Sequence, residues 1–208
     1  MRKTGFTIAA LLVTVFLGAS CAKAPAAPDN SATVTLQNGV NGYNGTQTVT
    51  IDSTAASTNF GSTLFMYVQT TTDPYYAYGF VKFDLSYLLP GTVIDSAAIT
   101  LYISYLNGPM SVDIWRVGAP WNQFTSTYSN TVFGGETLIA TDALSGSALT
   151  IQLPKQMVQE WVNNPAVNDG IYLSKSGAFG TYSVDFYMAG VSFTTPSLAP
   201  KIQIKYEK

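Results

Sequence analysis

Residues 98–105 read AITLYISY, and this stretch decides the fold class. Its apolar side chains recur at every second position, namely Ile99, Leu101 and Ile103. Successive side chains of a β-strand point to opposite faces, so this period of two predicts a strand with one buried face.

Many other segments carry the same signal. Residues 111–117 and 201–206 also alternate, and the lysines of the second stretch give it one wet face. Asn-Gly and Asp-Gly pairs, which favour turns, separate further strand candidates at residues 33–36, 46–51, 63–69, 76–85, 136–141, 148–153, 170–174 and 182–189. Strands this numerous and evenly spaced predict an all-β, antiparallel β-sandwich of the jelly-roll type.

One segment has the period of a helix instead. Within residues 153–163 (LPKQMVQEWVN), apolar side chains recur at helical spacing. Pro154 suits a first helical turn and Asn164-Pro165 ends the run. We expect one short helix near residues 154–163 that closes one end of the core. A ligand platform at Trp161 is the alternative.

The N-terminus has the pattern of an export signal. Arg2 and Lys3 precede an apolar run at residues 6–17, which is too short to span a bilayer. Cys21 then resembles a bacterial lipobox cysteine, which predicts lipidation there and attachment to the bacterial outer membrane. Ordinary cleavage after Ala22 is the alternative. We therefore expect a signal peptide at residues 1–20, a flexible tether at 21–31 and one domain at 32–208, located outside the cell or on its surface.

Composition argues against most catalytic chemistry. The chain has no histidine, and Cys21 is its only cysteine, so the usual nucleophile and base pairs are missing. No pair of glutamates suggests glycoside cleavage. The net charge is −2, which does not favour a nucleic-acid partner. The sequence predicts a protein that binds rather than one that catalyses.

Aromatic residues are the candidate binding groups, because the apolar face of a sugar packs on an aromatic ring. The chain holds 13 Tyr, 11 Phe and 3 Trp. Trp115 shares the parity of Asp113, opposite the apolar Val112 and Ile114, so its ring should face outward and be either a platform or covered by a loop. The predicted ligand-binding set is Tyr75, Tyr76, Tyr102, Tyr105, Trp115 and Trp121.

A structural calcium ion is a second expectation. Calcium takes oxygen ligands from carboxylates, amides and carbonyls in loops. The candidate ligands are Asp52, Asn59, Asp84 and Asp95. For Asp84 the alternative is a turn cap, in which the carboxylate accepts backbone hydrogen bonds.

The segments also resemble a known family. Residues 79–90 (GFVKFDLSYLLP), followed by Ile94-Asp95-Ser96-Ala97 and the strand after them, are similar to the DNRLRE domain, also classed as carbohydrate-binding module family 96. Asn59-Phe60-Gly61 and Trp121-Asn122 resemble further motifs of that family, and the ordered likeness runs from residue 45 to 207. The resemblance implies an extracellular jelly roll, some of whose relatives bind alginate-type or other glycans.

Together these observations predict an exported, non-catalytic surface domain that recognises a polysaccharide through exposed aromatic rings. The alternative is a structural or adhesive surface domain with a protein partner. Exposed rings beside polar groups would favour the first interpretation, and buried rings would favour the second.

Overall fold

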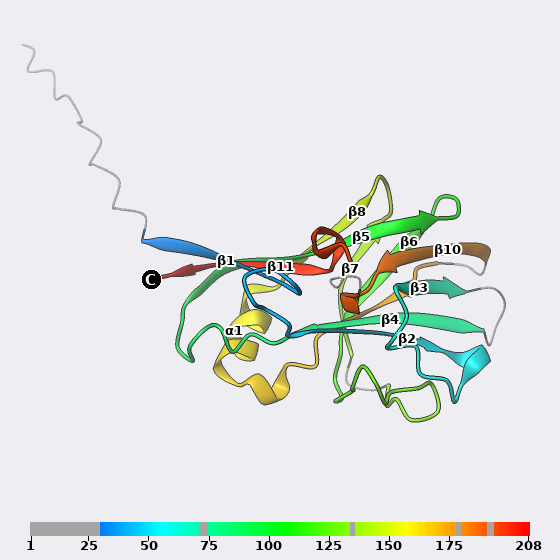
Figure 1. Cartoon of the computed structure of the whole chain (residues 1–208), viewed down its shortest axis with the longest axis horizontal. Helices are drawn as coiled ribbons and strands as arrows, with labels where there is room; N and C mark the ends of the chain where they lie inside the picture. The colour runs from blue at the N-terminus through cyan, green and yellow to red at the C-terminus, as the bar shows by residue number, and fades with distance from the viewer. Residues whose placement is uncertain (1–29, 71–74, 134–135, 178–179, 191–193) are drawn as a thin grey trace, which may run out of the picture.

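The computed structural model describes residues 30–70, 75–133, 136–177, 180–190 and 194–208. Eleven strands of these residues form one curled antiparallel sheet (Figure 1). The strands are β1 (Ser31–Gln37), β2 (Thr46–Asp52), β3 (Phe65–Thr70), β4 (Tyr76–Phe83), β5 (Ile94–Leu106), β6 (Ser111–Arg116), β7 (Thr137–Ala143), β8 (Ala148–Leu153), β9 (Ile171–Lys175), β10 (Gly180–Tyr187) and β11 (Lys201–Glu207). The predicted all-β antiparallel sandwich is confirmed.

The sheet curls so that its two halves enclose the core. One half has the order β1-β11-β5-β10-β3, with β8 paired to β5, and the other has the order β4-β9-β6-β7, with β2 paired to β4. The alternation read in residues 98–105 is what builds this core. Ile99 and Leu101 of one half lie with Val81 and Ile114 of the other in one apolar cluster.

The predicted helix is present as α1 (Lys155–Asn163), and short 3-10 helices lie at Ser53–Ala55, Pro165–Val167 and Pro196–Leu198. Helix α1 buries Met157, Val158, Trp161 and Val162 in the main core. Trp161 is thus a core residue rather than a ligand platform. Among the described residues, no helix is long and apolar enough to cross a membrane.

A second, smaller core lies on the outer face of β2, β4 and β9. It contains Val49 and Ile51 of β2, Phe80 of β4 and Tyr172 of β9. The long segment between β6 and β7 runs beneath these strands in Figure 1 and contributes Val117 and Trp121. This part of the sheet is therefore buried on both faces.

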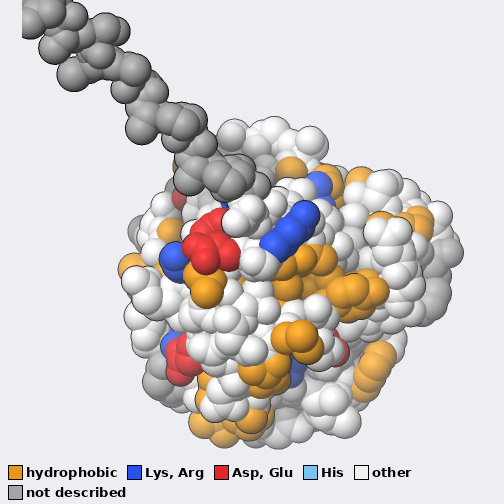
Figure 2. All heavy atoms as spheres, turned by 90° about the vertical axis from the view of Figure 1, so that its left-hand side faces the viewer, with side chains coloured by type: hydrophobic (Ala, Val, Ile, Leu, Met, Phe, Trp, Pro, Cys, Tyr) orange, Lys and Arg blue, Asp and Glu red, His pale blue; other side chains and the backbone are white. Residues whose placement is uncertain are grey.

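The predicted signal peptide, Cys21 and most of the predicted tether lie outside the described residues. The predicted domain from residue 32 begins within β1, whose Ser31 pairs with Glu207 near the other end of the chain. Figure 2 shows the end of the molecule near these termini, where charged side chains gather in small groups on a largely uncharged surface.

Candidate functional site

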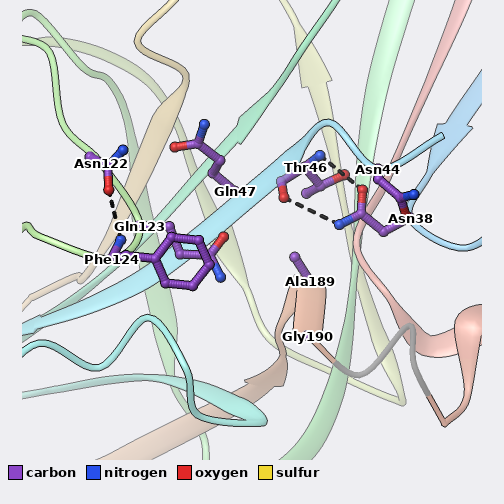
Figure 3. A pocket seen from close by; sticks show the side chains of 9 residues that line it. All are labelled: Asn38, Asn44, Thr46, Gln47, Asn122, Gln123, Phe124, Ala189 and Gly190. Carbon is purple, nitrogen blue, oxygen red and sulfur yellow. Dashed lines mark hydrogen bonds between the residues drawn. The ribbon is translucent and has the colours of Figure 1, made fainter.

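A cleft of about 480 Å³ is a candidate site, and we call it the amide cleft. Figure 3 shows its lining side chains, which come from the β1–β2 turn, from β2, from the β6–β7 segment and from the residues just after β10. They are Asn38, Asn44, Thr46, Gln47, Asn122, Gln123, Phe124, Ala189 and Gly190. Amide side chains dominate this lining, and none of its residues is charged.

Phe124 is the aromatic group of the amide cleft. The residue is 66% exposed, although Gln123, which precedes it, is buried. The backbone N–H of Phe124 donates to Asn122 Oδ1 at 2.9 Å (Figure 3). The backbone N–H of Asn122 in turn donates to Ser126 Oγ at 2.9 Å. An apolar ring that lies in solvent on a hydrogen-bonded backbone is a group available for a ligand.

Gln123 anchors the segment that carries Phe124. Its side chain is buried and bridges two elements: Nε2 donates to the Gly61 carbonyl at 2.6 Å, and Oε1 accepts from the Thr48 backbone N–H at 3.3 Å. Asn59, in the segment between β2 and β3, also holds this stretch: its Nδ2 donates to the carbonyls of Gln123 at 2.9 Å and Ser126 at 2.7 Å. These bonds preorganise the Phe124 side of the cleft.

On the opposite side, Asn38 closes the turn between β1 and β2. Its Nδ2 donates to the Thr46 carbonyl at 3.2 Å, and its Oδ1 accepts from the Thr46 N–H at 2.9 Å. Asn44, near the other end of this turn, is exposed. Gln47 Oε1 is buried but accepts no hydrogen bond from the described residues. A buried acceptor without a donor costs free energy.

Lys82 is the cation nearest to Gln47 in the sheet register, because the two residues are paired across β2 and β4. Its Nζ is already engaged: it donates to the Trp121 carbonyl at 3.2 Å and lies 5.0 Å from the centre of the Trp121 ring. Burial lowers the pKa of Lys82, and the attraction of Asp169 partly opposes that shift. Lys82 therefore helps to hold the β6–β7 segment, which carries Trp121, against the sheet.

Trp121 was predicted to present its ring to a ligand, and here the structure differs. The residue is only 7% exposed. Its ring meets Phe80 edge to face at 5.6 Å, and its Nε1 donates to the Asp169 carbonyl at 2.7 Å. The ring is buried because the β6–β7 segment folds back over the sheet and uses Trp121 as its apolar anchor.

Trp115 does lie on the outer face of its strand, as its parity predicted. Its ring stacks on Tyr172 with 6.2 Å between centres and 9° between planes, and its Nε1 donates to Ser174 Oγ at 3.0 Å. The side chain is half-buried at the edge of the second core. Of the two alternatives left open, packing accounts for most of this ring.

The remaining predicted aromatics lie apart from the amide cleft. Tyr75 is 48% exposed, and Tyr76 is half-buried and stacks on Tyr78. Tyr102 is half-buried on β5 with Lys201 Nζ 5.8 Å from its ring centre. Tyr105, near the end of β5, is more exposed and faces Asp185 of β10. The structure thus divides the predicted set among several surfaces.

The predicted calcium ligands are also separated. Asp52 pairs with Ala77 at one end of the β2–β4 ladder, whereas Asp84 follows Phe83, which pairs with Thr46 at the other end. Six residues of strand, or about 20 Å, separate these ends, so one ion cannot contact both carboxylates.

The individual ligands have other partners. Both Asp52 oxygens accept hydrogen bonds, from Thr54 and from the Tyr67 hydroxyl. Asp84 Oδ1 caps a turn by accepting from the Ser86 N–H, which is the alternative foreseen for it, and Asn59 holds the β6–β7 segment. Asp95 is half-buried on β5. No group of three or more His, Cys, Asp or Glu side chains gathers within the described part of the chain.

Sequence reasoning missed Phe124 and Gln47, the exposed ring and the unpartnered amide among the residues that line the cleft. Both positions had a usable signal. Phe124 is a large apolar residue three places after Trp121 in a stretch rich in Asn, Gln, Ser and Thr, where a core ring is unexpected. Gln47 stands in a strand among Thr and Val.

Comparison with known proteins gives one family. The sequence model of carbohydrate-binding module family 96 matches residues 41–148, just over half of the chain. This range includes Gln47, Asn122 and Phe124. Comparison with curated proteins gave no match.

Proposed function

Because the chain belongs to carbohydrate-binding module family 96, we propose that it binds a neutral polysaccharide in the amide cleft, without catalysis, as an exported surface domain. The observation that carries this proposal is the pairing of an exposed Phe124 ring, on a hydrogen-bonded backbone, with a lining of amides. The ring would pack on the apolar face of a sugar, and the amides would exchange hydrogen bonds with its hydroxyls.

The neutral class of the ligand follows from the lining. A uronate chain carries one negative charge per sugar and would require a cation to offset the loss of its hydration. The lining residues include no lysine or arginine, and Lys82 is committed to Trp121. Amides donate and accept equally well, which suits a hydroxyl, itself both donor and acceptor.

The non-catalytic part of the proposal rests on the same lining. Glycoside cleavage uses carboxylates, and proton transfer in general uses a titrating side chain. The amide cleft offers none among its lining residues. Arg116 and Glu160, which lie elsewhere, form an ion pair at 2.9 Å between β6 and α1. Their arrangement supports a structural role for this pair.

Export and anchoring rest on the N-terminal sequence alone. The apolar run before Cys21 supports secretion, and the cysteine supports a lipid anchor in the bacterial membrane. A domain held at the cell surface by a tether would bring its polysaccharide close to the cell.

Retention of the protein on polysaccharide gels tests this function. Gels containing neutral glucans, mannans or xylans should retard the wild type, and Phe124→Ala should reduce the affinity about tenfold, as for the loss of a binding hot spot. Tyr87→Ala is the matched control, because Tyr87 is 63% exposed and is not among the cleft residues. Equal retention of both variants, or none by the wild type, would instead favour the structural domain with a protein partner.

A further inference from the structure

A second surface combines aromatic rings with a carboxylate. Asp185 of β10 stands directly opposite Tyr67 of β3 on one side and Tyr105 of β5 on the other. Directly opposed residues have their Cβ atoms about 5 Å apart and share a face of the sheet. The three side chains therefore form one row across three strands, which we call the tyrosine row.

The tyrosine row lies on the outer face of its half of the sheet. The neighbouring Val184 and Phe186 of β10 are fully buried in the main core, so Asp185 between them points the other way. Tyr105 is 55% exposed. Beside the row, on the same face, Phe65 packs against Tyr187 with 5.4 Å between ring centres. An accessible ring thus adjoins a carboxylate within a largely aromatic surface.

The carboxylate of Asp185 has no partner among the described residues that would account for its position. It is half-buried, and burial raises its pKa. No hydrogen bond or ion pair joins it to another described residue. The Tyr67 hydroxyl, its neighbour, donates instead to Asp52 Oδ2 at 2.6 Å. A partly desolvated carboxylate that the fold leaves uncompensated is costly, and such groups gather at binding sites.

We propose that the tyrosine row is a second carbohydrate-contact site, in which a neutral sugar packs on Tyr105 while its hydroxyls donate to the Asp185 carboxylate. An ionised carboxylate accepts through both oxygens, and hydrogen bonds to it are stronger than those between neutral groups. The same negative charge repels the carboxylate of a uronate, so the ligand class expected at this site is a neutral sugar. The tyrosine row and the amide cleft are built from different residues. A single polysaccharide chain that contacts both sites would bind with a gain in avidity.

Titration calorimetry on the purified protein tests the site. The probes are neutral hexasaccharides of glucose, mannose and xylose, with oligogalacturonate as the charged comparison. Asp185→Asn keeps the shape of the side chain but removes the charge, and should weaken binding of the neutral probe about tenfold. Tyr105→Ala should have a similar effect. Asp142→Asn, on the edge strand β7 of the other half of the sheet, is the matched control.

Thermal unfolding of the same variants separates binding from structure. The melting temperature of Asp185→Asn should equal or exceed that of the wild type, because the substitution removes an uncompensated charge. In a Phe124→Ala background, Asp185→Asn should still weaken binding, since the two sites are separate. The proposal is overturned if Asp185→Asn and Tyr105→Ala both leave affinity unchanged, if Asp185→Asn lowers the melting temperature, or if no neutral probe binds the wild type.

Discussion

The backbone of Gly61 lies directly against that of Gln123. A Cβ on Gly61 would overlap the Gln123 carbonyl, and the Gln123 side chain donates back to the Gly61 carbonyl at 2.6 Å. This close approach fixes the segment that presents Phe124, although the two residues are far apart in the sequence. Only glycine fits there, because the atom in the way belongs to the backbone.

Gly61→Ala should therefore damage both stability and binding. The added methyl group must push the β6–β7 segment away, and overpacking of this kind costs about 1–3 kcal/mol of unfolding free energy. The displaced Phe124 should also lower the affinity for the polysaccharide. Chemical denaturation and gel retention measure the two effects, and a variant as stable as the wild type would contradict the packing described here.

Trp121→Ala should act mainly on stability. The ring is buried against Phe80, and its Nε1 bond to the Asp169 carbonyl would be lost. Removing a buried aromatic side chain costs about 3–5 kcal/mol. Phe124→Ala, in the same segment but exposed, should stay within about 0.5 kcal/mol of the wild type in denaturation experiments. Similar losses of unfolding free energy in both variants would contradict the assignment of Trp121 as the buried anchor and Phe124 as an exposed ring.

The charge of Asp185 should appear in the pH dependence of stability. Because burial raises its pKa, the folded protein holds this proton more tightly than the unfolded chain does. The contribution of Asp185 to stability therefore falls as pH rises from the ordinary carboxyl range, about 3.9, through the raised value.

Asp185→Asn has no such proton to lose, and the residues that face this position across the strands are Tyr67 and Tyr105. Its unfolding free energy, measured from pH 3 to 7, should rise relative to the wild type as pH increases. A difference that is constant with pH, or that shrinks, would contradict a desolvated carboxylate.

Cys21→Ser tests the proposed anchor. The wild type, expressed in a bacterium, should partition with membranes and incorporate labelled fatty acid, because a lipid chain added at Cys21 supplies the membrane affinity. The variant should be soluble and unlabelled. If the wild type is itself soluble and unlabelled, ordinary cleavage and secretion replace lipidation.

The strands were predictable because each half of the sandwich has one face in the main core. The period of two in residues 98–105 and the helical period in residues 153–163 each reflect one buried face, and both elements are present. Strand β5 is longer than its pattern, beginning at Ile94 because β11 continues to pair with it there. Local periodicity thus indicates the type of element, whereas pairing with a strand that is distant in the sequence decides the bounds of the element.

The site was less predictable, because periodicity tells which face a ring occupies but not what covers that face. Trp121 was expected in solvent, yet it anchors the β6–β7 segment onto the second core. Phe124 belongs to no periodic element, so its exposure follows from the hydrogen bonds around Asn122 and Gln123. The row of Tyr67, Asp185 and Tyr105 joins strands that are distant in sequence, and only their register brings the three together.

The central claim, that a neutral sugar sits on Phe124 in the amide cleft, is tested most directly by nuclear magnetic resonance of the side-chain amides. Titration of ¹⁵N-labelled protein with a neutral hexasaccharide that binds should shift the NH₂ signals of Gln47, Asn44 and Asn122 and the backbone N–H of Phe124. Phe124→Ala should abolish or strongly reduce these shifts. Shifts absent from these amides, or retained without the Phe124 ring, would contradict the account.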